Sequence, residues 1–187
     1  MIDTALNYFT NSSAISLGVL ALLSFYFILV FWIFLYKYFS LSASISAEIS
    51  NLTSLTARDG VINPLSRLGQ CVNKAPISKE FLNVCETSLV REASGGLSWL
   101  SIISSTAPFI GLFGTVVGIL ESFAKFATAS KVSFAVIAPV ISEALVATAC
   151  GIFVAIFAYT FHQILVRKVY EFSTYIRSQI DIVLARK

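Results

Sequence analysis

The sequence predicts an all-α membrane protein with three transmembrane helices and long helical extensions beyond the membrane. Of its 187 residues, 57% are hydrophobic and only 12% are charged, whereas soluble domains carry about 25% charged residues. Three apolar stretches each exceed the roughly 20 residues that a helix needs to cross a bilayer. After the first and the third stretch, apolar residues continue to recur at helical spacing, which predicts that these helices extend into water.

The first apolar stretch is uncharged from Thr4 to Tyr36, and residues 15–36 are enough to cross the membrane. Asp3 precedes this stretch where a cleavable signal peptide would have basic residues, so we expect it to remain as a transmembrane helix. Aromatic residues suited to a membrane interface stand at its end: Trp32, Tyr36 and Tyr38.

The polar segment 37–96 begins with a helical face made of Leu41, Ile45, Ile49, Leu52 and Leu55. Glycine and proline interrupt it at residues 58–64 and again at Pro76. We expect a short helix over residues 65–72. A further helix should begin at Ser78 and continue through Gly95 and Gly96 into the second span.

After the third span, the tail carries an apolar stripe of Val169, Phe172, Ile176, Ile180 and Val183. We therefore expect the third transmembrane helix to continue into the C-terminal tail as one helix.

The distribution of cations predicts the orientation. Six Lys and Arg residues follow the first span and five lie in the tail, whereas the N-terminus has none and the connection between spans two and three has two. Positive residues favour the cytoplasmic side. The predicted segments are a periplasmic N-terminus (1–14), transmembrane helix 1 (15–36), a cytoplasmic helical segment (37–96), transmembrane helix 2 (97–123), a periplasmic loop (124–133), transmembrane helix 3 (134–166) and a cytoplasmic C-terminal helix (167–187).

Composition excludes several functional classes. The net charge of +3 comes from scattered cations, which does not predict nucleic-acid binding but suits contact with membrane lipid. Cys71, Cys85 and Cys150 have no C-x-x-C spacing and His162 is the single histidine, so we expect free thiols and no metal site. The sequence offers no nucleophile paired with a base and no cofactor motif, so we predict no cofactor and no enzymatic activity.

The second span has one face of small or hydroxylated residues. On a helix with about 100° per residue, the following lie within roughly 60° of Thr115: Ser101, Ser104, Pro108, Gly111, Gly118 and Ser122. Such a face, together with the Gly114-xxx-Gly118 spacing, can serve close helix packing alone. It can also line a polar path. The glycines do not form a phosphate-binding loop, because the Lys-Ser/Thr ending is missing.

The third span contains one carboxylate, Glu143, in an otherwise uncharged apolar run. Its face carries Pro139 and Ala147, and Ala147 and Gly151 begin a second row of small residues. A carboxyl group at membrane depth can form a structural hydrogen bond, or it can exchange protons with a hydrated path. Thr148 lies about 140° around the helix from Glu143, so either the helix is locally distorted or one of the two faces a subunit boundary.

Three spans in one chain enclose a gated path poorly, so we infer a ring of several copies with spans two and three inside. The sequences APFIGLFGTVVGI (107–119) and APVISEALVATA (138–149) resemble the second- and third-span signatures of the TolQ–ExbB–MotA family of ion-driven stator proteins, and most closely its TolQ/ExbB branch. The resemblance covers roughly residues 97–168.

The resemblance implies a bacterial inner-membrane homopentamer that surrounds the single-span helices of a TolR- or ExbD-like partner. Proton flow would drive work that reaches a TolA- or TonB-like protein and thus the outer membrane. By the same resemblance, Thr115 and Thr148 line the proton pathway and Glu143 is its glutamate. Val117 replaces a tryptophan common in relatives, and the cytoplasmic loop is shorter than usual. The short N-terminus favours the Tol-Pal system over the Ton import system. The alternative is a passive membrane scaffold that anchors partners without conducting ions.

Overall fold

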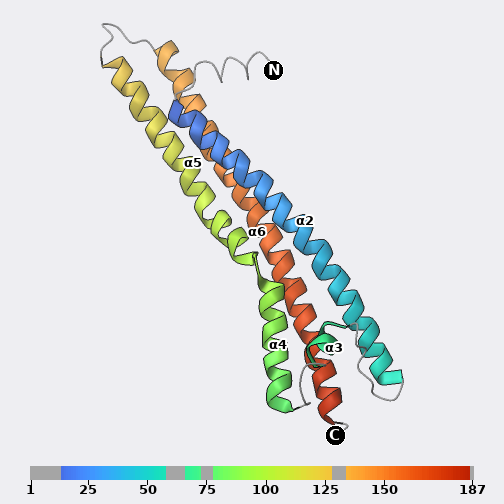
Figure 1. Ribbon diagram of the computed structural model, residues 1–187. Coiled ribbons are helices and arrows are strands. Elements are labelled where there is room, and N and C mark those ends of the chain that lie inside the picture. The colour runs from blue at the N-terminus through green and yellow to red at the C-terminus, as the bar shows by residue number, and fades with distance from the viewer. Residues whose placement is uncertain (1–13, 58–65, 73–77, 128–133, 186–187) are drawn as a thin grey trace. The chain divides into compact units, whose positions relative to one another are not determined.

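The computed structural model of the chain describes residues 14–57, 66–72, 78–127 and 134–185 (Figure 1). These residues form helices and contain no strand. The helices are α2 (Ala14–Ala57), α3 (Arg67–Val72), α4 (Lys79–Ser94), α5 (Leu97–Phe126) and α6 (Phe134–Ala185). Three of them are long and apolar enough to cross a membrane, over Ile15–Thr56, Leu97–Ala124 and Ile137–Ala185. The predicted all-α class with three candidate spans is therefore confirmed.

The chain divides into two compact units. The first unit consists of Met1–Trp32 and Trp99–Thr160, and the second of Ile33–Ser98 and Phe161–Lys187. Helices α2 and α6 contribute residues to both units.

In the first unit, aromatic rings and small residues fill the space between the helices. The Phe27 ring stacks on Phe153 and meets Phe157 edge-on, with centroids 5.8 Å apart in both cases. Further buried residues come from all three helices: Val19, Leu23, Val30, Ile103, Ala107, Ala144, Ala147, Val154 and Ala158. Large side chains thus join α2 to α6, whereas alanines and glycines dominate where α5 packs on α6.

In the second unit, the buried face of α2 runs through Leu41, Ile45 and Leu55, as the helical spacing predicts. Ile49, however, is 41% exposed, and Glu48 is fully buried in its place. An α-helix has 3.6 residues per turn, so two successive steps of four residues drift away from the core side. After the step from Leu41 to Ile45, a step of three residues to Glu48 returns to that side, whereas a step of four to Ile49 does not. The predicted face was wrong at this position.

The predicted helical tail is confirmed, because α6 is a single helix of 52 residues. Four residues of its predicted stripe are buried in the second unit, namely Val169, Phe172, Ile176 and Ile180, and so is Leu165 before them. The fifth, Val183, is only half-buried. In the same unit, the rings of Phe34 and Phe161 stack with centroids 3.9 Å apart.

Helix α4 begins where the sequence predicts. The Ser78 hydroxyl oxygen accepts a hydrogen bond from the backbone N–H of Phe81 at 3.1 Å, which is an N-cap interaction. The helix ends at Ser94, however, and does not continue into the second span. Gly96 has φ of +86°, a left-handed conformation that glycine adopts without steric cost. The predicted continuous helix through Gly95 and Gly96 is therefore wrong.

The prediction of free thiols is also wrong for two of the three cysteines. Cys71 of α3 and Cys85 of α4 form a disulfide, with Cα atoms 6.1 Å apart. The short helix α3 folds back on α4, and Leu68 and Leu82 are both fully buried near this link. Cys150 is a free thiol, as predicted.

Candidate functional site

The backbones of α5 and α6 approach each other closely at two glycines of the first unit. A Cβ atom on Gly111 would lie 2.6 Å from the carbonyl oxygen of Ala147, and one on Gly151 would lie 2.5 Å from the carbonyl oxygen of Ala107. Both distances are shorter than real Cβ contacts. Only glycine therefore permits this crossing, which is the small-residue packing that membrane helices use.

One turn from this crossing, Thr115 of α5 and Thr148 of α6 form a hydrogen bond between their hydroxyl groups. Thr115 is only 7% exposed. Its Oγ1 atom also lies 3.2 Å from the carbonyl oxygen of Gly111 and 3.1 Å from that of Ala144. Thr148 Oγ1 lies 3.3 Å from the same Gly111 oxygen. The two hydroxyl groups and two backbone carbonyls thus form one polar cluster between otherwise apolar helices.

The small face of α5 also contacts α2. A Cβ atom on Gly114 would lie 2.9 Å from Val19 Cγ1, and one on Gly118 would lie 3.3 Å from Ser16 Oγ. Gly114 faces α6 as well, since its Cβ would lie 3.2 Å from Ala147 Cβ. The glycine stripe is therefore placed where α5 contacts both of its neighbours in the first unit.

Two prolines lie inside the candidate membrane-spanning helices α5 and α6. Pro108 follows Ala107, whose carbonyl oxygen faces Gly151, and it is half-buried. Pro139 lies in the second turn of α6 and is exposed. A proline has no backbone N–H, so each leaves one carbonyl of the preceding turn without its helical partner.

Glu143 belongs to α6, but its side chain lies outside the part of the chain that the structure describes. Its helical position is known: it directly precedes Ala144, whose carbonyl oxygen faces Thr115. The backbone from Glu143 to Thr148 is assigned as α-helix throughout, and in a regular α-helix the two positions lie about 140° apart. Of the three residues predicted for a proton pathway, the structure brings together Thr115 and Thr148.

Sequence reasoning missed the backbone part of the cluster. The carbonyl groups of Gly111 and Ala144 become accessible to hydroxyl groups because neither residue has a large side chain to cover them. The available signal was the small residue four positions before each threonine. That pattern indicates a backbone carbonyl oxygen that a hydroxyl group can reach. It does not show whether the hydroxyl group comes from the same helix or from a neighbouring one.

These features define a class of membrane protein in which apolar helices pack through glycines and paired hydroxyl groups. In this chain the contact between α5 and α6 at Gly111, Thr115, Thr148 and Gly151 is called the seam. The sequence model of the MotA/TolQ/ExbB proton channel family matches residues 60–178. Because this match covers more than half of the chain, the protein belongs to that family.

Several relatives of known name are similar to this chain. A biopolymer transport protein of Helicobacter pylori (strain ATCC 700392 / 26695), described as ExbB-like 1, is 41% identical over the full length of both chains. The biopolymer transport protein ExbB of Pseudomonas putida is 47% identical over 79 residues, which are 42% of this chain and 24% of that protein. The Tol-Pal system protein TolQ of Pseudomonas aeruginosa is 52% identical over 60 residues, which are 32% of this chain and 26% of that protein.

Proposed function

We propose that this chain is the channel-forming stator subunit of a machine that converts the proton-motive force into mechanical work. Its partner would be a single-span protein of the TolR or ExbD type, and the work would reach the outer membrane through a TolA- or TonB-like protein. The similar proteins carry names from both systems, so the proposal concerns the machine and does not choose between Tol-Pal and Ton. It includes no enzymatic activity.

The observation that supports this proposal most directly is the hydroxyl pair of Thr115 and Thr148 in the seam between α5 and α6. A packing contact needs only small residues, yet here two hydroxyl groups lie between α5 and α6. The sequence of α6 also carries one carboxylate, Glu143, in an otherwise apolar run. Ionisable groups at membrane depth are costly and usually mark ion or proton routes. Hydroxyl groups can carry hydrogen bonds along such a route, because each donates and accepts.

The energy available is sufficient for a conformational step. One proton that crosses a potential of 100 mV releases about 2.3 kcal/mol. A few protons per step would therefore drive a rearrangement that costs several kcal/mol. The close-packed glycine seam would transmit such a rearrangement, because packed helices shift between discrete arrangements.

Assembly into a ring completes the proposal. Beside and opposite its small face, α5 exposes the large side chains Phe109, Leu112, Phe113, Val116 and Leu120, and Phe109 is 71% exposed. Lipid or further copies of the chain would cover them. We propose a homopentamer in the bacterial inner membrane, with the N-terminus in the periplasm, the C-terminus in the cytoplasm and the partner's helices inside the ring.

The experiment is proton uptake by liposomes that contain the chain and its TolR- or ExbD-type partner, followed with a pH-sensitive dye under an imposed membrane potential. Glu143→Gln should abolish uptake while native mass spectrometry shows the same assembly as wild type. Glu80→Gln, which removes a carboxylate from the exposed first turn of α4, should leave uptake unchanged.

Full proton uptake with Glu143→Gln would contradict the proposed role of this residue. A wild-type complex that assembles with its partner but transports no protons under any gradient would instead support a passive scaffold. A separate experiment assigns the chain to Tol-Pal or Ton: complementation of strains that lack either tolQ-type or exbB-type function.

A further inference from the structure

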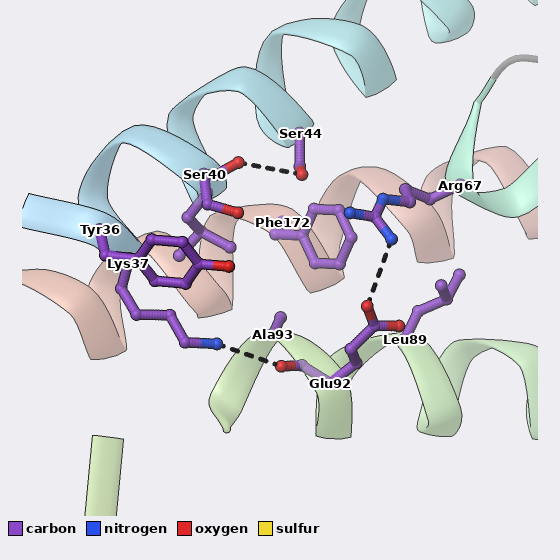
Figure 2. A pocket seen from close by; sticks show the side chains of 10 residues that line it. Tyr36, Lys37, Ser40, Ser44, Arg67, Leu89, Glu92, Ala93 and Phe172 are labelled. Atoms are coloured by element: carbon purple, nitrogen blue, oxygen red, sulfur yellow. Dashed lines mark hydrogen bonds and ion pairs between the residues drawn. The ribbon is translucent and has the colours of Figure 1, made fainter. Parts of the chain in front are cut away.

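The second unit contains a charged cavity of about 150 Å³, far above the roughly 15 Å³ that a single water molecule needs. Four helices contribute to its lining: α2, α3, α4 and α6 (Figure 2). Its polar side chains are Tyr36, Lys37, Ser40, Ser44, Arg67 and Glu92. Leu41 and Phe172, both buried, form part of its apolar wall.

Two cations approach one carboxylate residue in this cavity from two sides, as Figure 2 shows. Arg67 Nη1 lies 3.3 Å from Glu92 Oε1, and Lys37 Nζ lies 3.4 Å from the backbone carbonyl oxygen of Glu92. Among the residues that the structure describes, no carboxylate forms an ion pair with Lys37. The cavity therefore carries one more positive than negative charge.

The carboxylate that balances Arg67 is easily replaced. The side chains of Arg67 and Glu92 are 45% and 68% exposed, and solvent-exposed ion pairs contribute little to stability. The neighbouring carboxylate of Glu48 does not compete for these cations, because it is buried and accepts hydrogen bonds from the backbone N–H of Arg67 and from Gln179. An anion inside the cavity would be attracted by both cations.

The place of the cavity in the sequence indicates where such an anion would come from. Lys37 is the first charged residue after the uncharged stretch Thr4–Tyr36, and exposed Trp32 lies little more than one turn before it. Aromatic residues followed by a cation mark the headgroup level of a membrane. Basic pockets at this level are suited to anionic lipid headgroups.

We propose that this cavity binds a phosphate group between Lys37 and Arg67, supplied by the headgroup of an anionic phospholipid. The Ser40 hydroxyl would add a neutral donor, whereas Ser44 already donates to the carbonyl oxygen of Ser40 at 3.1 Å. The lipid tails would remain outside the cavity, in the membrane. This inference goes beyond the proposed function and does not depend on proton transport.

Glu92 has a defined part in the proposal. In the absence of phosphate it holds the Arg67 side chain toward the cavity, and with phosphate present it repels the bound anion. Glu92→Gln should therefore strengthen phosphate binding, whereas Lys37→Gln and Arg67→Gln should weaken it. Damage to the fold could weaken binding but would not strengthen it, so the opposite signs separate a binding site from a structural effect.

The test uses the purified full chain in a neutral detergent, with native mass spectrometry and thermal unfolding as readouts. The probes are dioleoyl phosphatidylglycerol, dioleoyl phosphatidylcholine and inorganic phosphate. We expect phosphatidylglycerol to bind more tightly than phosphatidylcholine, and each of Lys37→Gln and Arg67→Gln to weaken that binding about fivefold, the effect of one cation near an anionic headgroup. Lys79→Gln, a matched loss of charge at the start of α4 outside this cavity, should change nothing.

Equal binding of phosphatidylglycerol to wild type, Lys37→Gln and Arg67→Gln would overturn the proposal. Equal losses with Lys79→Gln would also overturn it, because they would reveal unspecific attraction to net charge. Stabilisation by inorganic phosphate that depends on Lys37 and Arg67, without selective retention of phosphatidylglycerol, would support the phosphate site and overturn the lipid as its source.

Discussion

The side-chain amide of Asn51 donates a hydrogen bond to Oε1 of Gln179 across 2.8 Å and so joins α2 to α6 within the second unit. Gln179 Nε2 in turn donates to the Glu48 carboxylate at 2.9 Å and to the Glu48 carbonyl oxygen at 3.0 Å. All three residues are buried. The other Glu48 oxygen accepts from the backbone N–H of Arg67 at 2.9 Å, which ties the start of α3 to the same network.

Gln179→Leu should lower the free energy of unfolding by about 3 kcal/mol, because it removes one hydrogen-bond donor from the buried Glu48 carboxylate and one acceptor from the buried Asn51 amide. Chemical denaturation of the full chain in detergent measures this change. The control is Gln163→Leu, the same substitution at an exposed position of α6, which should change stability little. Equal stabilities of the two variants would show that the network does not hold α2 and α6 together.

Gly151→Ala should lower the free energy of unfolding by about 1–3 kcal/mol, since the added methyl group would overlap the Ala107 carbonyl and force the helices apart. Gly18→Ala is the matched control, because a Cβ atom there meets nothing within 4 Å. That substitution should be neutral or slightly stabilising, as alanine favours helix over glycine. Equal losses in both variants would argue against a close crossing of α5 and α6.

Thr115→Val should lower the free energy of unfolding by about 0.6–1 kcal/mol, the usual contribution of a hydrogen bond between membrane helices. The substitution keeps the side-chain shape and removes the hydroxyl group that Thr148 and the Ala144 carbonyl contact. Thr160→Val removes a hydroxyl group that bonds only within the turn of an exposed part of α6, and we expect no loss there. Thermal unfolding of both variants in the same detergent compares them directly.

The disulfide between Cys71 and Cys85 predicts a defined thiol count. Denatured but unreduced protein should react with maleimide at one position, Cys150, and reduced protein at three. A disulfide that closes a loop of about 15 residues contributes about 3 kcal/mol to stability in the chain-entropy model. Cys71→Ser should therefore match reduced wild type in stability and fall below oxidised wild type, whereas Cys150→Ser should retain the difference between the two states.

The redox state in the cell can be read by alkylating all free thiols at the moment of lysis. Alkylation of all three cysteines would show that Cys71 and Cys85 are reduced in the cell. That result is expected if this segment lies in the cytoplasm, where thiols are kept reduced. Alkylation of Cys150 alone would contradict the predicted orientation, which puts residues 37–96 in the cytoplasm.

Hydropathy and helical spacing were enough to predict the three long helices and the extension of α6, because these features depend on local sequence. The stripe of the tail through Phe172 and Ile176 was correct for the same reason. The break at Gly96 was missed, since a pair of glycines is compatible with both a helix and a turn until the neighbouring contacts decide.

The remaining features depend on residues far apart in the chain. Spacing alone did not pair Cys71 with Cys85, and nothing in the polar segment distinguished Glu48 as a buried residue. At the candidate site, the small face of the second span was predictable, but its division between α2 and α6 was not. Gly114 contacts both helices because three elements meet there, and no periodicity contains that information.

The threonine pair has a further consequence for the movement of hydrogen atoms. Two hydroxyl protons share four acceptors, namely the carbonyl oxygens of Gly111 and Ala144 and the two hydroxyl oxygens themselves. Rotation of each C–O bond can therefore exchange one pattern of donors for another while every heavier atom stays in place. The direction of the hydrogen bond between Thr115 and Thr148 can therefore reverse while α5 and α6 stay in contact.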